Sequence, residues 1–414
     1  MKKQPLTLLS PVGSFDSLQA AIVGGAHAVY FGIEQLNMRA RSSINFTLED
    51  LKAIVTLCHD HQLKAYLTLN TILYDHDLRL MRSIIDEAQK QGIDAVIALD
   101  HSAILYAHEK GLPVHISTQV NITNLETVRF YAQYADVMVL SRELTLQQVA
   151  HICEGVRKHQ IVGPSGQLVQ IETFVHGALC MAVSGKCYLS LHTMNASANR
   201  GACKQNCRRS YTVKDEEGNE LLIDNEYIMS PKDLSTIGFL HQLLDAGVSV
   251  LKIEGRSKGP DYVKVVTQCY REAMDYWQRE ELPSPDQINE WESRLVTVYN
   301  RGFWGGYYLG KKMGEWTDTE GSKATRLKSY IGKGNKYFDN IKIGEFQMEK
   351  DTLSVGDQIM ITGPSLGVLE MAVPNLRLSD GTEVTQVKKG DVFSMPVDQK
   401  VRNSDKLFKV TERA

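Results

Sequence analysis

The chain has 414 residues, of which 43% are hydrophobic and 23% are charged. This composition is typical of a folded globular protein and excludes a disordered or fibrous chain, and the length allows two or three domains. The formal net charge of −3 excludes a general attraction to nucleic acid, so an RNA partner must be held by local basic patches. No run approaches the ~18 to 20 apolar residues of a membrane span, and the start of the chain lacks the apolar stretch of a signal peptide. We therefore expect a cytoplasmic protein with no membrane partner.

Short apolar runs recur through the first two thirds of the chain, each after a helix-like stretch. Runs that are apolar on consecutive residues are typical of parallel strands buried on both faces. Eight strand–helix units over about 250 residues predict an α/β fold, a (β/α)8 TIM-like barrel, at residues 1–280. The predicted strands lie within residues 6–11, 24–32, 64–70, 92–99, 113–118, 134–140, 169–176 and 246–255.

The last third of the chain has a different pattern of polar and apolar residues. Residues 281–329 are predicted to be a linker, with a helix at 285–299 and an irregular segment rich in Gly, Trp and Tyr after it. From Tyr330 onward, polar and apolar residues alternate between glycine turns. This pattern predicts a small all-β domain at 330–414, which we expect to be a β-barrel.

One connection in the predicted barrel is much longer than the others. Residues 177–248 join the seventh strand to the eighth, whereas loops of this kind usually span roughly two to six residues. In barrel enzymes the loops that follow the strands form the active site. We therefore expect this long insertion to carry the function.

Four of the seven cysteines lie in this insertion, spaced C-x6-C-x15-C-x3-C. Thiols stay reduced in the cytoplasm, so such a group indicates metal binding, and four thiolates can hold a zinc ion or an iron–sulfur cluster. Structural zinc usually takes two tight cysteine pairs and only the last two cysteines have that spacing, which favours a cluster and leaves zinc as the alternative. The predicted ligands are Cys180, Cys187, Cys203 and Cys207, whereas Cys58, Cys153 and Cys269 lie on apolar helical stripes and are expected to pack.

The residues around these cysteines resemble the signature of the collagenase-like peptidase family, the U-32 family. The resemblance is carried by residues 172–190 (ETFVHGALCMAVSGKCYLS), 199–209 (NRGACKQNCRR) and 251–256 (LKIEGR), and it extends over nearly the whole chain. The family includes oxygen-independent hydroxylation proteins that carry a 4Fe-4S cluster on four such cysteines. They act in ubiquinone synthesis, on ribosomal RNA or on the wobble uridine of tRNA. The C-x3-C ending and the β domain are most similar to the tRNA type, which implies prephenate as hydroxyl donor and 5-hydroxyuridine as product, with a ribosomal RNA cytidine as the alternative target.

Polar and charged side chains follow several predicted strands and are expected to gather at the barrel mouth. Arginine suits a donor with two carboxylates, because its planar fork pairs with carboxylate in a bidentate way. The arginines, the histidine and the glutamates each also have a role outside the chemistry as an alternative. An arginine could be an ordinary charged residue on the solvated surface, and the histidine could be structural. Either glutamate could hold an arginine or lysine in place. The candidates are Arg39, Arg41, Asn70, Gln119, Arg142, Glu172, His176, Glu254 and Arg256.

Two basic segments are candidates for contact with tRNA. Arg200, Lys204, Arg208 and Arg209 surround the last two cysteines, and residues 323–342 hold six Lys or Arg against one Asp, a local excess of five positive charges. Phosphate groups could bind at both segments, with a solvated linker as the alternative for the second. Electron-donor or maturation proteins are further candidates for partners.

Proteolysis is the rival function. No His-Glu-x-x-His motif occurs, and the Gly-x-Ser-x-Gly at 363–367 precedes strand-like residues, so it is predicted to be a β-turn and not a nucleophile elbow. A cysteine protease using Cys180 and His176 would leave the other three cysteines of the insertion without a role. A third alternative is a non-enzymatic RNA-binding or assembly protein that keeps the cluster for structure.

Overall fold

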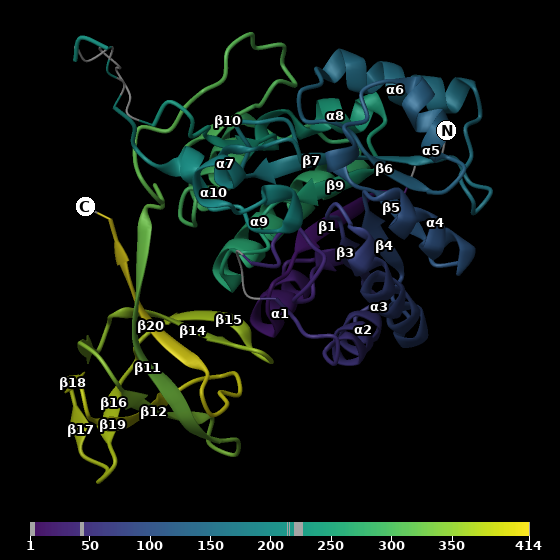
Figure 1. Cartoon of the computed structure of the whole chain (residues 1–414). Coiled ribbons are helices and arrows are strands. Elements are labelled where there is room, and N and C mark those ends of the chain that lie inside the picture. The colour runs from purple at the N-terminus through teal and green to yellow at the C-terminus, as the bar shows by residue number, and fades with distance from the viewer. Residues whose placement is uncertain (1–4, 42–44, 213, 215, 219–226, 414) are drawn as a thin grey trace.

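Eight parallel strands close into a barrel in the computed structural model, which describes residues 5–41, 45–212, 214, 216–218 and 227–413 (Figure 1). The strands follow chain order around the ring, and β9 closes it by pairing with both β1 and β7. The eight predicted strands are thus confirmed. They are β1 (Thr7–Pro11), β2 (Ala28–Phe31), β3 (Lys64–Leu69), β4 (Ala95–Ala98), β5 (Val114–Ile116), β6 (Val137–Val139), β7 (Gln170–Gly177) and β9 (Val250–Ile253).

Amphipathic helices cover the outside of the barrel because their apolar faces pack on the strands. Local signals fix their ends: Thr145 and Gln148 form a reciprocal capping box at the start of α6, and Gly92 ends α3 in the left-handed conformation with φ of 80°. The helices are α1 (Phe15–Val23), α2 (Leu51–Asp60), α3 (Leu78–Gln91), α4 (His101–Glu109), α5 (Leu125–Tyr131), α6 (Leu146–Lys158), α8 (Leu240–Ala246) and α9 (Pro260–Gln278).

The long insertion and the linker both return to the barrel sheet. The insertion holds α7 (Leu189–Met194) and β8 (Asp233–Ser235), which pairs antiparallel with the end of β7. After α10 (Pro285–Leu295), the linker strand β10 (Phe303–Trp304) pairs with β8. The segment predicted to be irregular therefore extends the barrel sheet and brings linker residues to the barrel mouth.

The C-terminal residues form an antiparallel β domain, as predicted, and its first strand begins at Arg326. Eight strands are hydrogen-bonded side by side, with β15 at one edge and β17 at the other. Because β15 and β17 do not pair with each other, the described residues form an open sheet and not the expected closed barrel. In order across the sheet these are β15 (Gly367–Ala372), β14 (Gln358–Gly363), β20 (Lys406–Glu412), β11 (Arg326–Phe338), β12 (Ile343–Met348), β19 (Val392–Pro396), β16 (Leu376–Leu378) and β17 (Glu383–Val384); β13 (Thr352–Ser354) pairs with β18 (Gln386–Lys388).

The β domain packs on the barrel through β14 and β15, which lie against α1 and α9. Met360 and Val368 belong to the same apolar core as the barrel, and Lys264 Nζ donates to the Val368 carbonyl at 3.2 Å. The turn between the two strands is the Gly-x-Ser-x-Gly segment, with Gly363 paired to Gly367, so the predicted β-turn is confirmed. None of the described helices is long and apolar enough to cross a membrane.

Candidate functional site at the barrel mouth

Backbone and side-chain hydrogen bonds to α7 hold the segment of the insertion that contains the last two of its four cysteines. The amide of Lys204 donates to Ser190 Oγ at 3.0 Å, and Asn206 Nδ2 donates to Thr193 Oγ1 at 2.5 Å. These bonds fix the segment that contains Cys203 and Cys207 against the helix that follows Cys187. Cys180 is exposed, and the other three thiols are partly buried.

The four thiols share one electrostatic environment. Burial raises the pKa of Cys207, Arg208 opposes the rise, and Cys180, Cys203 and Cys187 each add to it. Among the described residues, no three His, Cys, Asp or Glu side chains lie close enough together to hold one metal ion. Four neighbouring thiols nevertheless match the donor set of a 4Fe-4S cluster, which spreads its ligands more widely than a single ion does. The residues present therefore fit such a group.

An ion pair lies at the barrel mouth, between the segment that follows β2 and the residue that follows β9. Arg39 Nη2 lies 2.8 Å from Glu254 Oε1. Burial lowers the pKa of Arg39, but Glu254 raises it by more, and the nearby Cys180 adds to the rise. Burial would raise the pKa of Glu254, but Arg39, Arg142 and Arg256 outweigh it and hold that pKa at about 2. Glu254 is therefore ionised at neutral pH, and it holds an arginine in place.

Two more predicted arginines lie at the mouth. Arg256 is buried and donates to Thr68 Oγ1 at 2.8 Å and to Asn37 Oδ1 at 3.2 Å. Burial lowers its pKa to about 10, which still leaves it charged at neutral pH. Arg142 donates to the Ala178 carbonyl at 2.9 Å, and its guanidinium carbon lies 3.7 Å from the centroid of the Phe174 ring. Its buried Nε has no hydrogen-bond partner among the described residues.

The predicted polar residues form a small network beneath the insertion. Asn70 Nδ2 donates to Gln119 Oε1 at 3.4 Å, and Ser117 Oγ donates to the same oxygen. Gly185 of the insertion lies over this network with φ of +73°, and a Cβ there would lie 3.0 Å from Gln119 Cβ. Asn70 and Gln119 thus lie at the mouth as predicted, covered by the insertion that carries the cysteines.

Three predicted site residues lie elsewhere. Glu172 is in the barrel interior, where its Oε1 lies 2.6 Å from Lys252 Nζ. The His176 ring packs near Phe303 and Tyr270, with Nδ1 3.4 Å from the Tyr270 hydroxyl, and burial lowers its pKa to about 3. His176 is therefore a neutral structural residue between β7 and α9. Arg41 has an exposed side chain, although its backbone amide donates to the Gly201 carbonyl at 3.1 Å.

The structure adds a cluster that the sequence reasoning missed. Lys258 Nζ lies 2.9 Å from the centroid of the Tyr299 ring, and Arg301 Nη1 lies 3.5 Å from Asp233 Oδ1. Lys258 comes from the segment after β9, Asp233 from the insertion, and the other two from the linker. A signal was present in the sequence, because Arg301 is a charged residue inside an aromatic segment, and a charged side chain that is buried with such a segment needs a partner.

Most of the predicted phosphate-binding cations already have partners. Arg200 forms an ion pair with Asp77, and Arg208 donates to the Pro231 carbonyl at 2.8 Å. In the second segment, carboxylates elsewhere in the chain neutralise most of the expected excess charge. The ion pairs there are Lys323–Asp318, Arg326–Glu370, Lys328–Asp261, Lys333–Glu349 and Lys342–Asp398, while Lys336 lies over Phe338.

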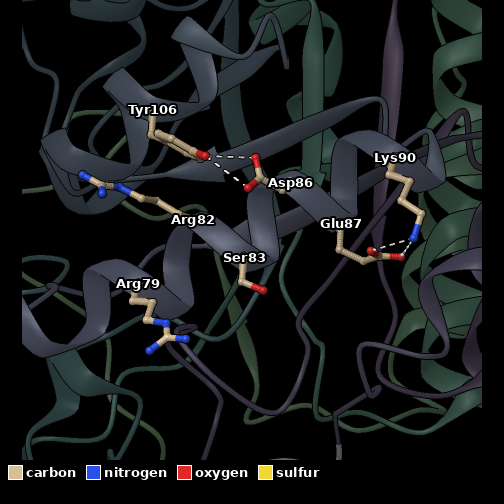
Figure 2. A pocket seen from close by; sticks show the side chains of 7 residues that line it. All are labelled: Arg79, Arg82, Ser83, Asp86, Glu87, Lys90 and Tyr106. Atoms are coloured by element: carbon tan, nitrogen blue, oxygen red, sulfur yellow. Dashed lines mark hydrogen bonds and ion pairs between the residues drawn. The ribbon is translucent and has the colours of Figure 1, made fainter.

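A hollow on the outer surface of α3 and α4 is unrelated to the mouth (Figure 2). Its side chains contact one another or close neighbours: the Tyr106 hydroxyl donates to Asp86 at 3.0 Å, Asp86 forms an ion pair with Lys110, and Lys90 lies 3.2 Å from Glu87. These contacts leave a solvated surface with no group poised for chemistry.

The chain is similar to known proteins over most of its length. The model of Peptidase family U32 matches residues 13–318. A collagenase of Porphyromonas gingivalis is 54% identical over 100% of both chains. A 23S rRNA 5-hydroxycytidine synthase of Escherichia coli is 38% identical over 65% of this chain and 39% of its own length. A tRNA hydroxylation protein of Bacillus subtilis is 26% identical over 97% of this chain and 94% of its own length. The chain belongs to Peptidase family U32.

Proposed function

We propose that this protein hydroxylates the wobble uridine of tRNA to 5-hydroxyuridine without oxygen, with prephenate as the hydroxyl donor. The observation that carries the proposal is the shared environment of the four thiols beside the Arg39–Glu254 pair. The likeness to the tRNA hydroxylation protein spans almost the whole chain, including the β domain, whereas the likeness to the ribosomal RNA enzyme spans 65% of it. This difference supports tRNA as the substrate.

The residues of the mouth suit the parts of such a reaction. A 4Fe-4S cluster on Cys180, Cys187, Cys203 and Cys207 would supply the iron for a hydroxylation that uses no molecular oxygen. Arg39 is kept charged and oriented by Glu254, which suits it to bind one carboxylate of the donor. A base splayed out from single-stranded RNA, as such bases are usually read, would have to enter beside the insertion, because the amides of Asn70 and Gln119 hydrogen-bond to each other beneath it.

The proposal is tested by mass spectrometry of tRNA nucleosides from cells that lack the protein. We expect 5-hydroxyuridine and its derivatives to be absent. Wild type and Arg82→Ala should restore them, because Arg82 lies on the outer surface of α3, whereas Arg39→Ala should not. If 5-hydroxyuridine persists while a modified cytidine disappears from ribosomal RNA, the substrate proposed here is wrong.

Peptide hydrolysis is the second candidate, and it is favoured by the 54% identity to a protein named collagenase. A Cys180–His176 pair is poorly suited to it. Cys180 is exposed in the insertion, whereas His176 is 1% exposed and packed against Tyr270. A general base must reach the proton that it removes, and a buried ring on the helix side of β7 is badly placed for that.

We expect the full-length protein to show no specific cleavage of gelatin or collagen peptides. The measurement compares wild type with Cys180→Ser, before and after iron chelation. Specific cleavage that is lost in Cys180→Ser yet survives chelation would make peptidase the better assignment, because a thiol nucleophile needs no iron.

A further inference from the structure

Lys258 and Arg301 meet where the linker returns to the barrel mouth. Both side chains approach the ring of Tyr299: Lys258 Nζ lies 2.9 Å from its centroid and the Arg301 guanidinium carbon 5.2 Å from it. Lys258 also interacts electrostatically with Arg39 and Glu254, so the cluster borders the site of the proposed chemistry.

The charges around this cluster do not balance. The mouth holds six cationic side chains and two carboxylates, an excess of four positive charges among these side chains; four thiolates on a 4Fe-4S core of charge +2 would add about −2 and still leave a positive excess. Arg39 is paired with Glu254 at 2.8 Å, and Arg301 reaches Asp233 at 3.5 Å. Within the described residues, no carboxylate forms an ion pair with Lys258. The cations are Arg39, Arg142, Arg208, Arg256, Lys258 and Arg301, and the carboxylates are Asp233 and Glu254.

A partly buried ammonium group without an ion-pair partner costs free energy, because it has lost water and gained only the weaker attraction of the more distant Asp233 and Glu254. An incoming oxyanion removes that cost. The ammonium group of lysine supplies a compact positive charge, and the planar guanidinium of arginine can donate two parallel hydrogen bonds to a carboxylate or phosphate. The Tyr299 ring covers one side of both cations and thereby limits the direction from which an anion can approach.

We propose that Lys258 and Arg301 form a binding subsite for an oxyanion, either a carboxylate of a small organic acid or a phosphate of an RNA substrate. The subsite follows from the charges whichever reaction the mouth performs. Its assignment to one carboxylate of prephenate, with Arg39 taking the other, rests on the proposed function.

Binding at this subsite depends on pH. Burial lowers the pKa of Lys258 to about 7, Arg301 and Arg39 lower it too, and Asp233 and Glu254 oppose them. Asp233 has a raised pKa because it is buried, although Arg301 lowers it. Lys258 is therefore protonated below pH 7 and loses its charge as the pH rises through that value. Anion affinity should fall over the same range, and binding should take up a proton.

The test is calorimetric titration of the full-length holoprotein with prephenate and, separately, with an anticodon stem-loop RNA. Lys258→Met should weaken binding of one probe on the order of 10- to 100-fold, which is the usual effect of losing a hydrogen bond to a charged group. Lys258→Arg should keep the affinity and lose the pH dependence around 7. Lys52→Met, an exposed lysine on α2, is the matched control and should bind like wild type.

Each outcome is decisive. A loss confined to prephenate assigns the subsite to a carboxylate, and a loss confined to RNA assigns it to a phosphate. Equal affinity of Lys258→Met and wild type for both probes would overturn the subsite, as would wild type that binds neither. If Lys258→Met does not fold, the pH profile of Lys258→Arg decides instead. Binding is measured without turnover, so a failed hydroxylation experiment would refute the proposed function and leave the subsite standing.

Discussion

Replacing Cys187 by alanine should leave the protein without iron, whereas Cys153→Ala should keep the full complement. Cys187 is one of the three thiols that raise the pKa of Cys207, so we place it in the ligand set. Cys153 is buried on α6, and burial raises its pKa to about 12. A thiol in apolar surroundings stays protonated and is a poor metal ligand.

The measurement uses protein purified without oxygen. Wild type and Cys153→Ala should be brown, absorb near ~400 nm and contain about four irons per chain, as expected for one 4Fe-4S cluster. Circular dichroism checks that Cys187→Ala is folded. A colourless wild type with one zinc would contradict the prediction, and so would a Cys187→Ala variant that keeps four irons.

The barrel could be predicted because its strands are continuous apolar runs, which a sequence displays directly. β8 and β10 could not, because they have three and two residues and carry no pattern. Their pairing depends on contacts between segments far apart in the chain. This tertiary pairing is also why Tyr299 and Arg301, predicted to be linker residues, lie at the mouth.

The spacing of the four cysteines and their place in the insertion predicted a shared site, and the structure brings three of the thiols within electrostatic reach of Cys207. The direction of the His176 side chain could not be predicted. Glu172 faces the barrel interior, where it pairs with Lys252, and Phe174 lies beside the same lysine, 5.5 Å from Nζ to the ring centroid. Strict alternation would place His176 on that face too. The pairing of β7 with β9 shifts between Phe174 and His176, and such a bulge turns the following side chain to the other face.

Charge counting along the sequence could not find the carboxylate partners of the basic segment, for a similar reason. Lys328 pairs with Asp261 on α9, and Arg326 pairs with Glu370 on β15. These partners are distant in the sequence and become neighbours only when the β domain folds and packs on the barrel. A local excess of positive charge therefore predicts a phosphate site only where the fold brings no carboxylate to it.

Lys252→Met should destabilise the protein by about 3 to 5 kcal/mol, because it leaves the Glu172 carboxylate uncompensated in the barrel interior. The side chains of Glu172 and Lys252 are 0% and 6% exposed, and the second carboxylate oxygen of Glu172 has no hydrogen-bond partner among the described residues. Lys252 Nζ also lies 4.7 Å from the centroid of the Tyr30 ring. Water cannot easily replace the lost ammonium group at such a site.

The double variant Glu172→Leu/Lys252→Met separates the cost of an unpaired charge from the loss of packing. Apolar replacement of a buried ion pair is often neutral or stabilising, so the double variant should recover most of the lost free energy of unfolding. Urea titration measures that free energy for each variant, and Lys64→Met, an exposed lysine at the start of β3, should stay within about 0.5 kcal/mol of wild type. If Lys252→Met is as stable as wild type, the interior does not hold an ionised Glu172. If the double variant is no more stable than Lys252→Met, the loss comes from packing of the lysine stem rather than from charge.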